Sequence, residues 1–521
     1  MQQTRRDAAG KTATVGILGG GTSGYLTALS MKRARPELDV SVIESSRIPV
    51  IGVGEATTSE IVPYLHRILG LDVHEFYREL KPTWKLGIKF VWGLPGDYSF
   101  NFPFDFPHPL ESLLYEGHLR NTSLLSILME QKKGLVVSRR DGAGHSLLSS
   151  SPYAYHLDNK RFVRYLQNQA DRAGILRLNR EIVDAELSEN GDIACLVASD
   201  SSRYAYDLYV DCSGFRSLLL EHKLGSKFIS YADSLFTDRA IPADVPHGGV
   251  LKPYTRADSM RSGWCWNIPQ LESDHCGYVF SSAFCSEEEA VAEMREKYPE
   301  MGETRLIKFR SGRHEEFWKG NVIAVGNSYG FVEPLESTAI QMMLYENLAM
   351  MRYFPVQKSE QHNKPIVNRY VAGKWDYLRW FLGIHYRFNR KYDSPFWKHC
   401  REHTNIAGAE EALRLFQQGA PLSYGRLDEA KRRAPRPAFD EFGYDMLLLG
   451  QGVPASFVKP LETREAYLGK LRGREWVARG ALSHERSLEV LQAGEEDLLS
   501  AHIADDQSWV GVFEKDLRQR V

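Results

Sequence analysis

The feature that most constrains the fold is a glycine-rich turn near the N-terminus. Residues 14–19 are a short apolar run that predicts a buried strand, and residues 23–34 follow with helical periodicity. The turn between them, residues 19–24, matches the pattern GxGxxG, and residues 39–44 predict a second buried strand. Strand, turn, helix and strand in this order predict a right-handed βαβ unit.

This unit has the features of a dinucleotide site. Gly19 permits the tight turn, Gly21 lets backbone N–H groups approach a pyrophosphate, and Gly24 lets helix and strand pack closely. The helix start, with Thr22 and Ser23, supplies partial positive charge. Glu44 ends the second strand, where a carboxylate binds ribose hydroxyls, so the pattern favours FAD or NAD.

Two later segments favour FAD over NAD. Residues 206–214 and 321–327 are apolar strands that run into small-residue turns, the second of them containing Gly326. Flavoproteins with a p-hydroxybenzoate-hydroxylase-like fold build their FAD site from such returns to the first sheet. The other interpretation is that both are ordinary core strands.

Composition excludes several classes of protein. The 521-residue chain has 65 Lys plus Arg against 67 Asp plus Glu, so nothing favours nucleic acid or an anionic membrane as a partner. The cysteines form no CxxC pair, which argues against a metal site, and their scattering favours a reducing cytoplasm. There is no apolar run long enough to cross a bilayer. We therefore expect a cytoplasmic protein without a metal.

The organisation along the chain is mixed. We expect a disordered leader (1–12), an FAD-binding domain (13–350) with an inserted β-rich region (about 85–150 and 225–305), and a helical substrate-covering domain (351–521). The pattern predicts strands at 87–93, 181–188, 192–198 and 205–211, a helix at 159–173, helices at 367–390, 407–418 and 462–516, and a linker at 427–438. The fold class is α/β with a Rossmann-like FAD-binding domain.

Four motifs together resemble the flavin-dependent halogenases of the tryptophan-halogenase family. They are Ile51-Gly-Val-Gly-Glu-Ala-Thr57, Trp84-Lys-Leu-Gly-Ile-Lys-Phe90, the WxWxIP motif Trp264-Cys-Trp-Asn-Ile-Pro269, and Gly330-Phe-Val-Glu-Pro-Leu-Glu-Ser-Thr338. The combination of WxWxIP with the glycine turn is specific, because simple aromatic hydroxylases lack it. The likeness covers nearly the whole chain and is weakest after about residue 455.

The resemblance implies roles for individual residues. Lys85 matches the catalytic lysine, and Glu336 matches the carboxylate that stabilises the cationic ring intermediate and removes its proton. The remaining implied residues are Gly54, Glu55 and Ala56 for the cofactor, Thr338 and Ala339 for the halide, Trp264, Trp266, Ile268, Pro269 and Ser337 for a tunnel, and Phe104 and His108 for the substrate. Ala339 departs from the glycine common in the family, which puts the halide preference in doubt.

The implied reaction uses FADH2, O2 and chloride or bromide to halogenate an electron-rich ring of the indole, phenol or pyrrole type. Hypohalous acid would travel from the flavin through the tunnel to Lys85, which either donates a hydrogen bond to it as an ammonium or forms a haloamine as a free amine. The implied partners are a separate flavin reductase and a small aromatic substrate, free or carrier-bound. The chain would be a monomer or homodimer.

Other interpretations of the same residues stay open at this stage. Lys85 could be a strand-edge lysine with its head in solvent, Glu336 a helix N-terminal carboxylate, and His108 a packing residue. Trp264 and Trp266 alternate at strand period, so they could belong to an ordinary core. As whole-protein alternatives, a single-component flavin monooxygenase would hydroxylate the ring and oxidise NAD(P)H directly, and a non-catalytic FAD-fold protein would turn over no arene.

Overall fold

The computed structural model describes residues 13–48, 55–105, 107–138, 144–353, 363–419, 421–425, 441–456 and 460–492. The expected leader (1–12), the expected linker (427–438) and residues 493–521 lie outside these ranges, as does Gly54.

The βαβ unit predicted from the glycine turn is present and starts a six-stranded sheet. The strands, in spatial order, are β10 (Leu176–Asn179), β2 (Asp39–Glu44), β1 (Thr14–Leu18), β14 (Leu208–Asp211), β23 (Val322–Ala324) and β22 (Trp318–Lys319). The first five run parallel, and β22 is antiparallel to β23. The two later segments expected to return to the first sheet, β14 and β23, therefore do so.

A seven-stranded sheet forms the second layer of the molecule. Its strands, in spatial order, are β20 (Ile307–Lys308), β16 (Arg239–Val245), β19 (Asp274–Phe280), β18 (Gly263–Pro269), β17 (Thr255–Met260), β5 (Gly87–Val91) and β6 (Phe100–Pro103). All neighbouring pairs are antiparallel except β17 and β5. The WxWxIP motif makes up most of β18, near the middle of this sheet.

A small sheet lies between the two larger ones, and we call it the bridging sheet. It contains β3 (Glu55–Ala56), β9 (Ala154–Leu157) and β4 (Thr83–Lys85), with β9 in the centre. One edge strand carries the end of the first motif, and the other carries Lys85. The bridging sheet therefore links two segments that the sequence places about 30 residues apart.

Three further small sheets lie outside this framework. They are β11 (Ile182–Leu187) with β12 (Ile193–Ala198) and β13 (Arg203–Tyr204), β15 (Phe228–Ser230) with β21 (Gly312–His314) and β24 (Gly330–Phe331), and β25 (Ala481–Ser483) with β7 (Lys133–Ser138) and β8 (Gly144–Ser146). The predicted strands at 87–93, 181–188, 192–198 and 205–211 correspond to β5, β11, β12 and β14.

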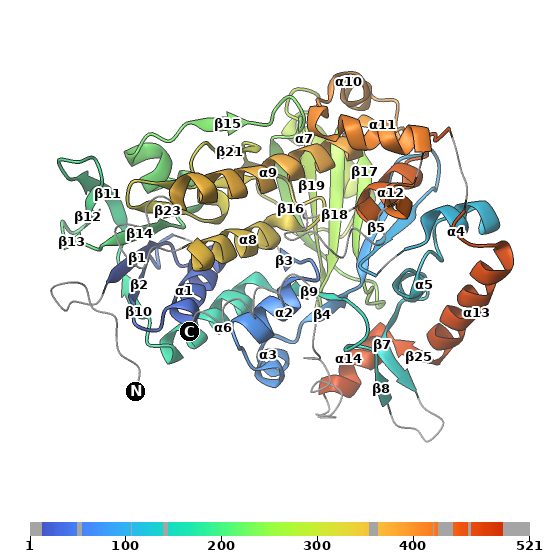
Figure 1. Cartoon of the computed structure of the whole chain (residues 1–521), viewed down its shortest axis with the longest axis horizontal. Coiled ribbons are helices and arrows are strands. Elements are labelled where there is room, and N and C mark those ends of the chain that lie inside the picture. The colour runs from blue at the N-terminus through green and yellow to red at the C-terminus, as the bar shows by residue number, and fades with distance from the viewer. Residues whose placement is uncertain are drawn as a thin grey trace.

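Helices surround the sheets (Figure 1). In the first two thirds of the chain they are α1 (Thr22–Ala34), α2 (Ile61–Pro63), α3 (Val73–Leu80), α4 (Pro109–Glu116), α5 (Leu124–Glu130), α6 (Asn159–Arg172), α7 (Glu287–Lys297) and α8 (Thr338–Tyr353). They continue with α9 (Lys364–Arg387), α10 (Pro395–His403), α11 (Glu410–Gly419), α12 (Glu441–Gly450), α13 (Arg464–Gly480) and α14 (His484–Gln492). The helix predicted at 159–173 is α6, whereas the prediction of one helical segment from 462 is wrong at β25, which interrupts it. None of the described helices combines the length and apolar character that crossing a bilayer requires.

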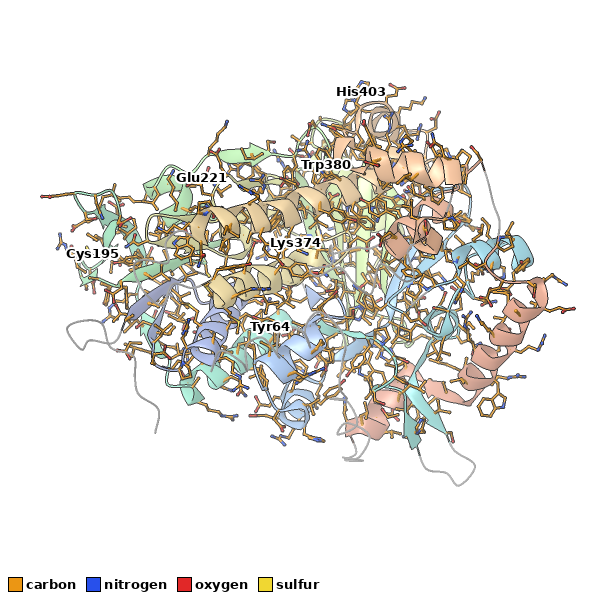
Figure 2. All side chains as sticks on the ribbon, in the orientation of Figure 1. Tyr64, Cys195, Glu221, Lys374, Trp380 and His403 are labelled. Carbon is orange, nitrogen blue, oxygen red and sulfur yellow. The ribbon has the colours of Figure 1, made fainter. Side chains whose placement is uncertain are left out.

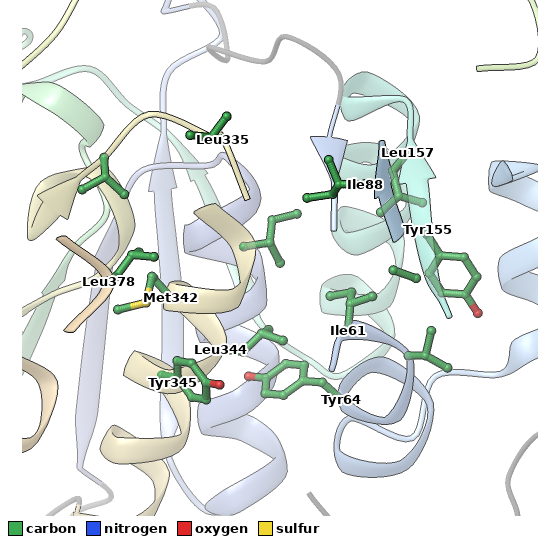
Figure 3. Close-up of a cluster of buried hydrophobic side chains, with 14 of the residues drawn as sticks. Ile61, Tyr64, Ile88, Tyr155, Leu157, Leu335, Met342, Leu344, Tyr345 and Leu378 are labelled. Carbon is green, nitrogen blue, oxygen red and sulfur yellow. The ribbon is translucent and has the colours of Figure 1, made fainter. Parts of the chain in front are cut away.

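One hydrophobic core joins the first sheet, the bridging sheet and the C-terminal helices. Figure 3 shows part of it, with Met342 and Leu344 of α8 on one side of the view and Ile61 of α2 and Leu157 of β9 on the other. Leu335, directly before Glu336, belongs to the same core. The start of α8 is therefore held by packing against the strands that also carry Lys85.

Candidate active site

A long groove connects the glycine turn with the face of the seven-stranded sheet. Its lining at one end includes the turn residues 19–23 and Glu44, and at the other end Trp266, Ile268, Ser337 and Ala339. Glu55 and Ala56 of β3 also line it, so most of the expected cofactor-binding residues share one cavity of about 320 Å³. An elongated cofactor with a polar and an aromatic half fits this arrangement.

The glycine turn is tight for reasons that the structure makes specific. Gly19 has φ +121°, and a Cβ there would lie 2.2 Å from the carbonyl oxygen of Cys212. A Cβ at Gly24 would lie 1.9 Å from the carbonyl oxygen of Gly19. Helix α1 starts directly after Gly21 and has no acidic side chain in its first turn. Its free N–H groups therefore face the groove without a competing negative charge, as a bound pyrophosphate requires.

Two carboxylates line the groove near this turn. Glu44 at the end of β2 accepts a hydrogen bond from the Arg177 guanidinium at 3.1 Å. Glu55 in β3 accepts one from the Asn159 amide at 2.8 Å, and burial raises the pKa of Glu55 to about 7. Both residues lie where the sequence analysis expects cofactor contacts.

Gly326 is a more indirect contributor. Its φ of +67° permits the turn after β23, and its N–H donates to Glu346 at 2.7 Å. Gly326 does not itself line the groove, whereas Asn327 does. Burial raises the pKa of Glu346 to about 8, so this carboxyl supports the turn from inside the protein. Gly326 therefore shapes a turn beside the groove without lining it, and its expected role at the cofactor stays a prediction.

The turn before α8 presents unsatisfied polar groups toward the groove. Ser337 has φ +59°, and both Ser337 and Ala339 line the groove. Within the described part of the chain, the hydroxyls of Ser337 and Thr338 are buried and have no hydrogen-bond partner. The first N–H groups of a helix also lack partners inside the helix. The free N–H groups of this turn can therefore bind a small anion, and its hydroxyls can hydrogen-bond to a small polar molecule.

Lys85 is completely buried, so the interpretation as a strand-edge lysine with its head in solvent is wrong. Its Nζ donates to the Thr57 carbonyl at 2.9 Å and lies 5.4 Å from the centroid of the Phe104 ring. Burial lowers the pKa of Lys85 to about 7, and the carboxylates of Glu336 and Glu60 oppose this shift. Near neutral pH both the ammonium and the free amine are therefore accessible.

Glu336 is also buried, and its partner is a residue that the sequence analysis missed. The Glu336 Oε1 lies 2.6 Å from Nε2 of His385 in α9, and Nδ1 of His385 lies 3.1 Å from the Phe381 carbonyl. A carbonyl only accepts, so Nδ1 carries hydrogen, and the short contact at Nε2 requires a second proton shared with the carboxyl. Glu336 and His385 thus form a buried pair that holds one proton between them.

Two further charged groups, Glu60 and Lys374, interact with each other, and Glu60 also interacts with Lys85. Burial raises the pKa of Glu60, which precedes α2, while Lys374 of α9 opposes the shift. Burial lowers the pKa of Lys374 to about 8, and its Nζ lies 4.6 Å from the centroid of Tyr345. Figure 2 shows Lys374 in the interior of the molecule on α9. No local motif marks Glu60, Lys374 or His385 in the sequence.

Part of the WxWxIP motif lines the groove, and its end is tied to the strand of Lys85. Trp264 and Trp266 are both buried in β18, with ring centroids 6.1 Å apart. Trp266 and Ile268 line the groove, whereas Trp264 does not. The Pro269 carbonyl accepts a hydrogen bond from the Thr83 hydroxyl at 2.8 Å, which ties the end of the motif to the strand of Lys85.

The two expected substrate residues separate. Phe104 follows β6 and contacts the Lys85 ammonium as described above. His108 instead precedes α4. Its Nδ1 lies 3.4 Å from the Glu462 carboxylate, and its backbone N–H donates a hydrogen bond to the Thr122 carbonyl. Among the described residues, no group of three or more potential ligands is arranged to hold a metal ion.

Comparisons with known proteins agree with this geometry. A profile of the tryptophan halogenase family matches residues 14–466. The crystal structure of MibH, a lanthipeptide tryptophan 5-halogenase, superposes with a TM-score of 0.91, is 44% identical, and covers 98% of each chain. The 7-chloro-L-tryptophan 6-halogenase KtzR of Kutzneria sp. (strain 744) is 32% identical over 78% of this chain and 85% of its own. BrvH, a flavin-dependent halogenase from Brevundimonas sp. BAL3, is 28% identical with a TM-score of 0.81, covering 92% and 99% of the two chains.

Proposed function

The chain belongs to the tryptophan halogenase family and is a flavin-dependent enzyme, and from this premise we propose that it halogenates an indole ring in two separated steps. An oxidant forms at the aromatic end of the groove, and Lys85 delivers it to the substrate. The observation that carries this proposal is the complete burial of Lys85 within reach of the Glu336 charge, on a strand that is tied to the end of the WxWxIP motif lining the groove.

The groove residues would hold FAD along its length. The N–H groups after Gly21, with Thr22 and Ser23, would hold the pyrophosphate, and Glu44 would hold the ribose of the adenosine half. The isoalloxazine ring would lie against Trp266 and Ile268. The reduced flavin supplies the chemistry by which O2 and a halide become hypohalous acid.

The residues at the start of α8 would bind the halide. The N–H groups of Thr338 and Ala339 belong to the first turn of this helix, which has no acidic side chain. The partial positive charge of a helix N-terminus favours a small anion there. The unpartnered hydroxyl of Ser337 would then accept or donate to the neutral hypohalous acid as it leaves.

Lys85 and Glu336 would act on the ring. Lys85 either donates a hydrogen bond to the hypohalous oxygen or carries the halogen as a haloamine, and a pKa of about 7 is compatible with both. Glu336 would stabilise the cationic ring intermediate and accept its proton, and the hydrogen bond with His385 would position the Glu336 carboxyl group. Phe104 would stack against the indole beside Lys85.

We propose a tryptophan side chain within a peptide as the substrate. The relative that is 44% identical over almost its whole length acts on a lanthipeptide, whereas KtzR, at 32%, acts on a chlorinated free tryptophan. A separate flavin reductase would supply FADH2, because the sequence shows no second dinucleotide motif. Free tryptophan is the alternative substrate.

The test is turnover with FAD, a flavin reductase, NADH and bromide, using a tryptophan-containing peptide and free tryptophan in parallel. Mass spectrometry should show a bromine isotope pattern on the peptide that disappears in Lys85→Ala. Lys89→Ala is the matched control, because Lys89 lies in the next strand and its ammonium pairs with Glu130 at 2.6 Å. Product from Lys85→Ala at the level of the unmodified enzyme would refute the proposal. Direct NADH oxidation with a hydroxylated product and no need for halide would identify a monooxygenase instead.

A further inference from the structure

A buried histidine lies at the centre of the bridging sheet and takes no part in the mechanism above. His156 of β9 is paired in register with Ala56 of β3 on one side and with Thr83 of β4 on the other. It is 1% exposed and lies on the strand between the groove-lining residues of β3 and the strand of Lys85.

The hydrogen bonds of His156 have a fixed direction. The Thr83 hydroxyl donates to the Pro269 carbonyl at 2.8 Å, so its oxygen is the acceptor for Nδ1–H of His156 at 3.2 Å. A neutral ring then has a lone pair at Nε2, which accepts from the Thr255 hydroxyl at 2.9 Å. The neighbouring positive charge of Lys85 and burial both lower the pKa of His156, in agreement with a neutral ring.

Thr255 ends this chain of hydrogen bonds at the groove. It lines the groove, and by the register of β17 and β18 it lies beside Ile268 of the WxWxIP motif, one step beyond the pair Arg256–Asn267. Because its hydrogen is committed to His156, the oxygen of Thr255 offers only lone pairs to the groove. Hypohalous acid is an O–H donor and can use this acceptor, whereas a halide anion is repelled by it.

We propose that Thr255 is a transit site for hypohalous acid between the flavin groove and Lys85, and that His156 is the positioning residue that keeps its hydroxyl in the accepting orientation. This inference rests on the proposed function and adds the two residues that select the neutral oxidant over the halide. No bond forms or breaks at either residue. Their effect is on the fraction of oxidant that reaches the lysine.

The experiment compares Thr255→Val, which removes the hydroxyl at nearly constant shape, with Thr255→Ser, which keeps it. The ratio of halogenated product to FADH2 oxidised should fall about fivefold to tenfold in Thr255→Val and stay within about twofold in Thr255→Ser. FAD affinity, measured by flavin fluorescence, and the melting temperature of the apoprotein should be similar in both variants. A merely structural threonine would lower stability and leave the product ratio unchanged, which would overturn the proposal.

His156→Phe tests the positioning role. It should lower the same ratio, and the double variant with Thr255→Val should lower it no further than either single change, because His156 acts through Thr255. Independent effects that multiply would overturn the positioning role. If unmodified enzyme gives no halogenated product at all, the proposed function fails rather than this inference.

A measurement without flavin completes the test. In apoprotein labelled with ¹⁵N-histidine, the signals missing from His156→Phe identify His156, and at neutral pH they should show the neutral tautomer with hydrogen on Nδ1. A protonated ring or hydrogen on Nε2 would reverse the direction of the hydrogen bonds and overturn the inference.

Discussion

The glycine-turn end of the groove and the Lys85 site are built in opposite ways. At the glycine turn the lining comes from one short stretch, residues 19–23, with Glu44 close by in the same βαβ unit. At the Lys85 site, which does not line the groove, Lys85 comes from β4, Glu336 from the loop before α8, and His385 from α9. The first end is a local structure that binds, and the second is a tertiary structure that brings reactive groups together.

The electrostatics of the two ends differ in the same sense. Glu44 is partly exposed, and its charge is balanced by Arg177. Lys85, Glu336 and Glu60 are shielded from water, and their mutual attraction does not offset the loss of hydration at Lys85, so its pKa falls to about 7. A group that delivers the oxidant near neutral pH needs such a shift in its pKa, whereas Glu44 is held by an ion pair.

The largest expected effect concerns the local end. Gly24→Ala places a methyl group where the Gly19 carbonyl oxygen lies 1.9 Å away, so the turn must open and its N–H groups lose their alignment. We expect FAD affinity to fall by about 1,000-fold or more, measured by flavin fluorescence quenching. Gly373→Ala is the control, since Gly373 is also helical and a Cβ there meets nothing within 4 Å. Unchanged FAD affinity in Gly24→Ala would show that the turn does not hold the cofactor.

A smaller effect is expected at the tertiary end, and it should leave FAD binding intact. Glu336→Gln removes the carboxylate that accepts the ring proton, and general-base loss lowers rates by about 100-fold or more. Product formation in single turnover should fall accordingly, with normal oxidation of FADH2. Glu333→Gln is the control three residues earlier, where the buried carboxyl bonds to Thr237 instead of His385. Equal rates for Glu336→Gln and unmodified enzyme would remove Glu336 from the reaction.

The pH dependence of the halogenation step tests the charge state of Lys85. If the Lys85 ammonium donates a hydrogen bond to hypohalous acid, the halogenation step slows about tenfold per pH unit as the pH rises above about 7. If instead the free amine forms a haloamine, the step slows as the pH falls below about 7. Glu55 titrates in the same range, so the step is measured in single turnover with FAD saturating. A rate that stays constant from pH 6 to pH 8 would contradict both roles of Lys85.

The same contrast explains what could be predicted from sequence. The βαβ unit, the glycine roles and Glu44 follow from periodicity and spacing, because their contacts are local, and β14 and β23 follow from apolar runs. Lys85, Glu336 and the tryptophans were predicted only through the family resemblance. His385, Glu60, His156 and Thr255 carry no motif, because each gains its role from a partner on another element, such as the Glu336 carboxylate for His385. The interruption of the last helical segment by β25 depends on pairing with β7, which a local pattern does not contain.

The smallest expected effect concerns Ala339. This residue is the second of α8 and lines the groove, where its methyl group adjoins the turn that we propose for the halide. Bromide is larger than chloride, so a methyl group that narrows the turn disfavours bromide. Ala339→Gly should therefore raise the ratio of brominated to chlorinated product by about threefold. The ratio is measured by mass spectrometry in a competition with both halides. A free-energy difference of about 1.4 kcal/mol corresponds to a tenfold change in this ratio, and the loss of one methyl contact is worth less than that. An Ala→Gly substitution in the interior of a helix destabilises it by about 1 kcal/mol at most, and the cost is smaller in the first turn, where Ala339 lies. The melting temperature should therefore change little. If the product ratio is the same in both proteins, the halide does not touch this residue, and the anion site must be sought away from the start of α8.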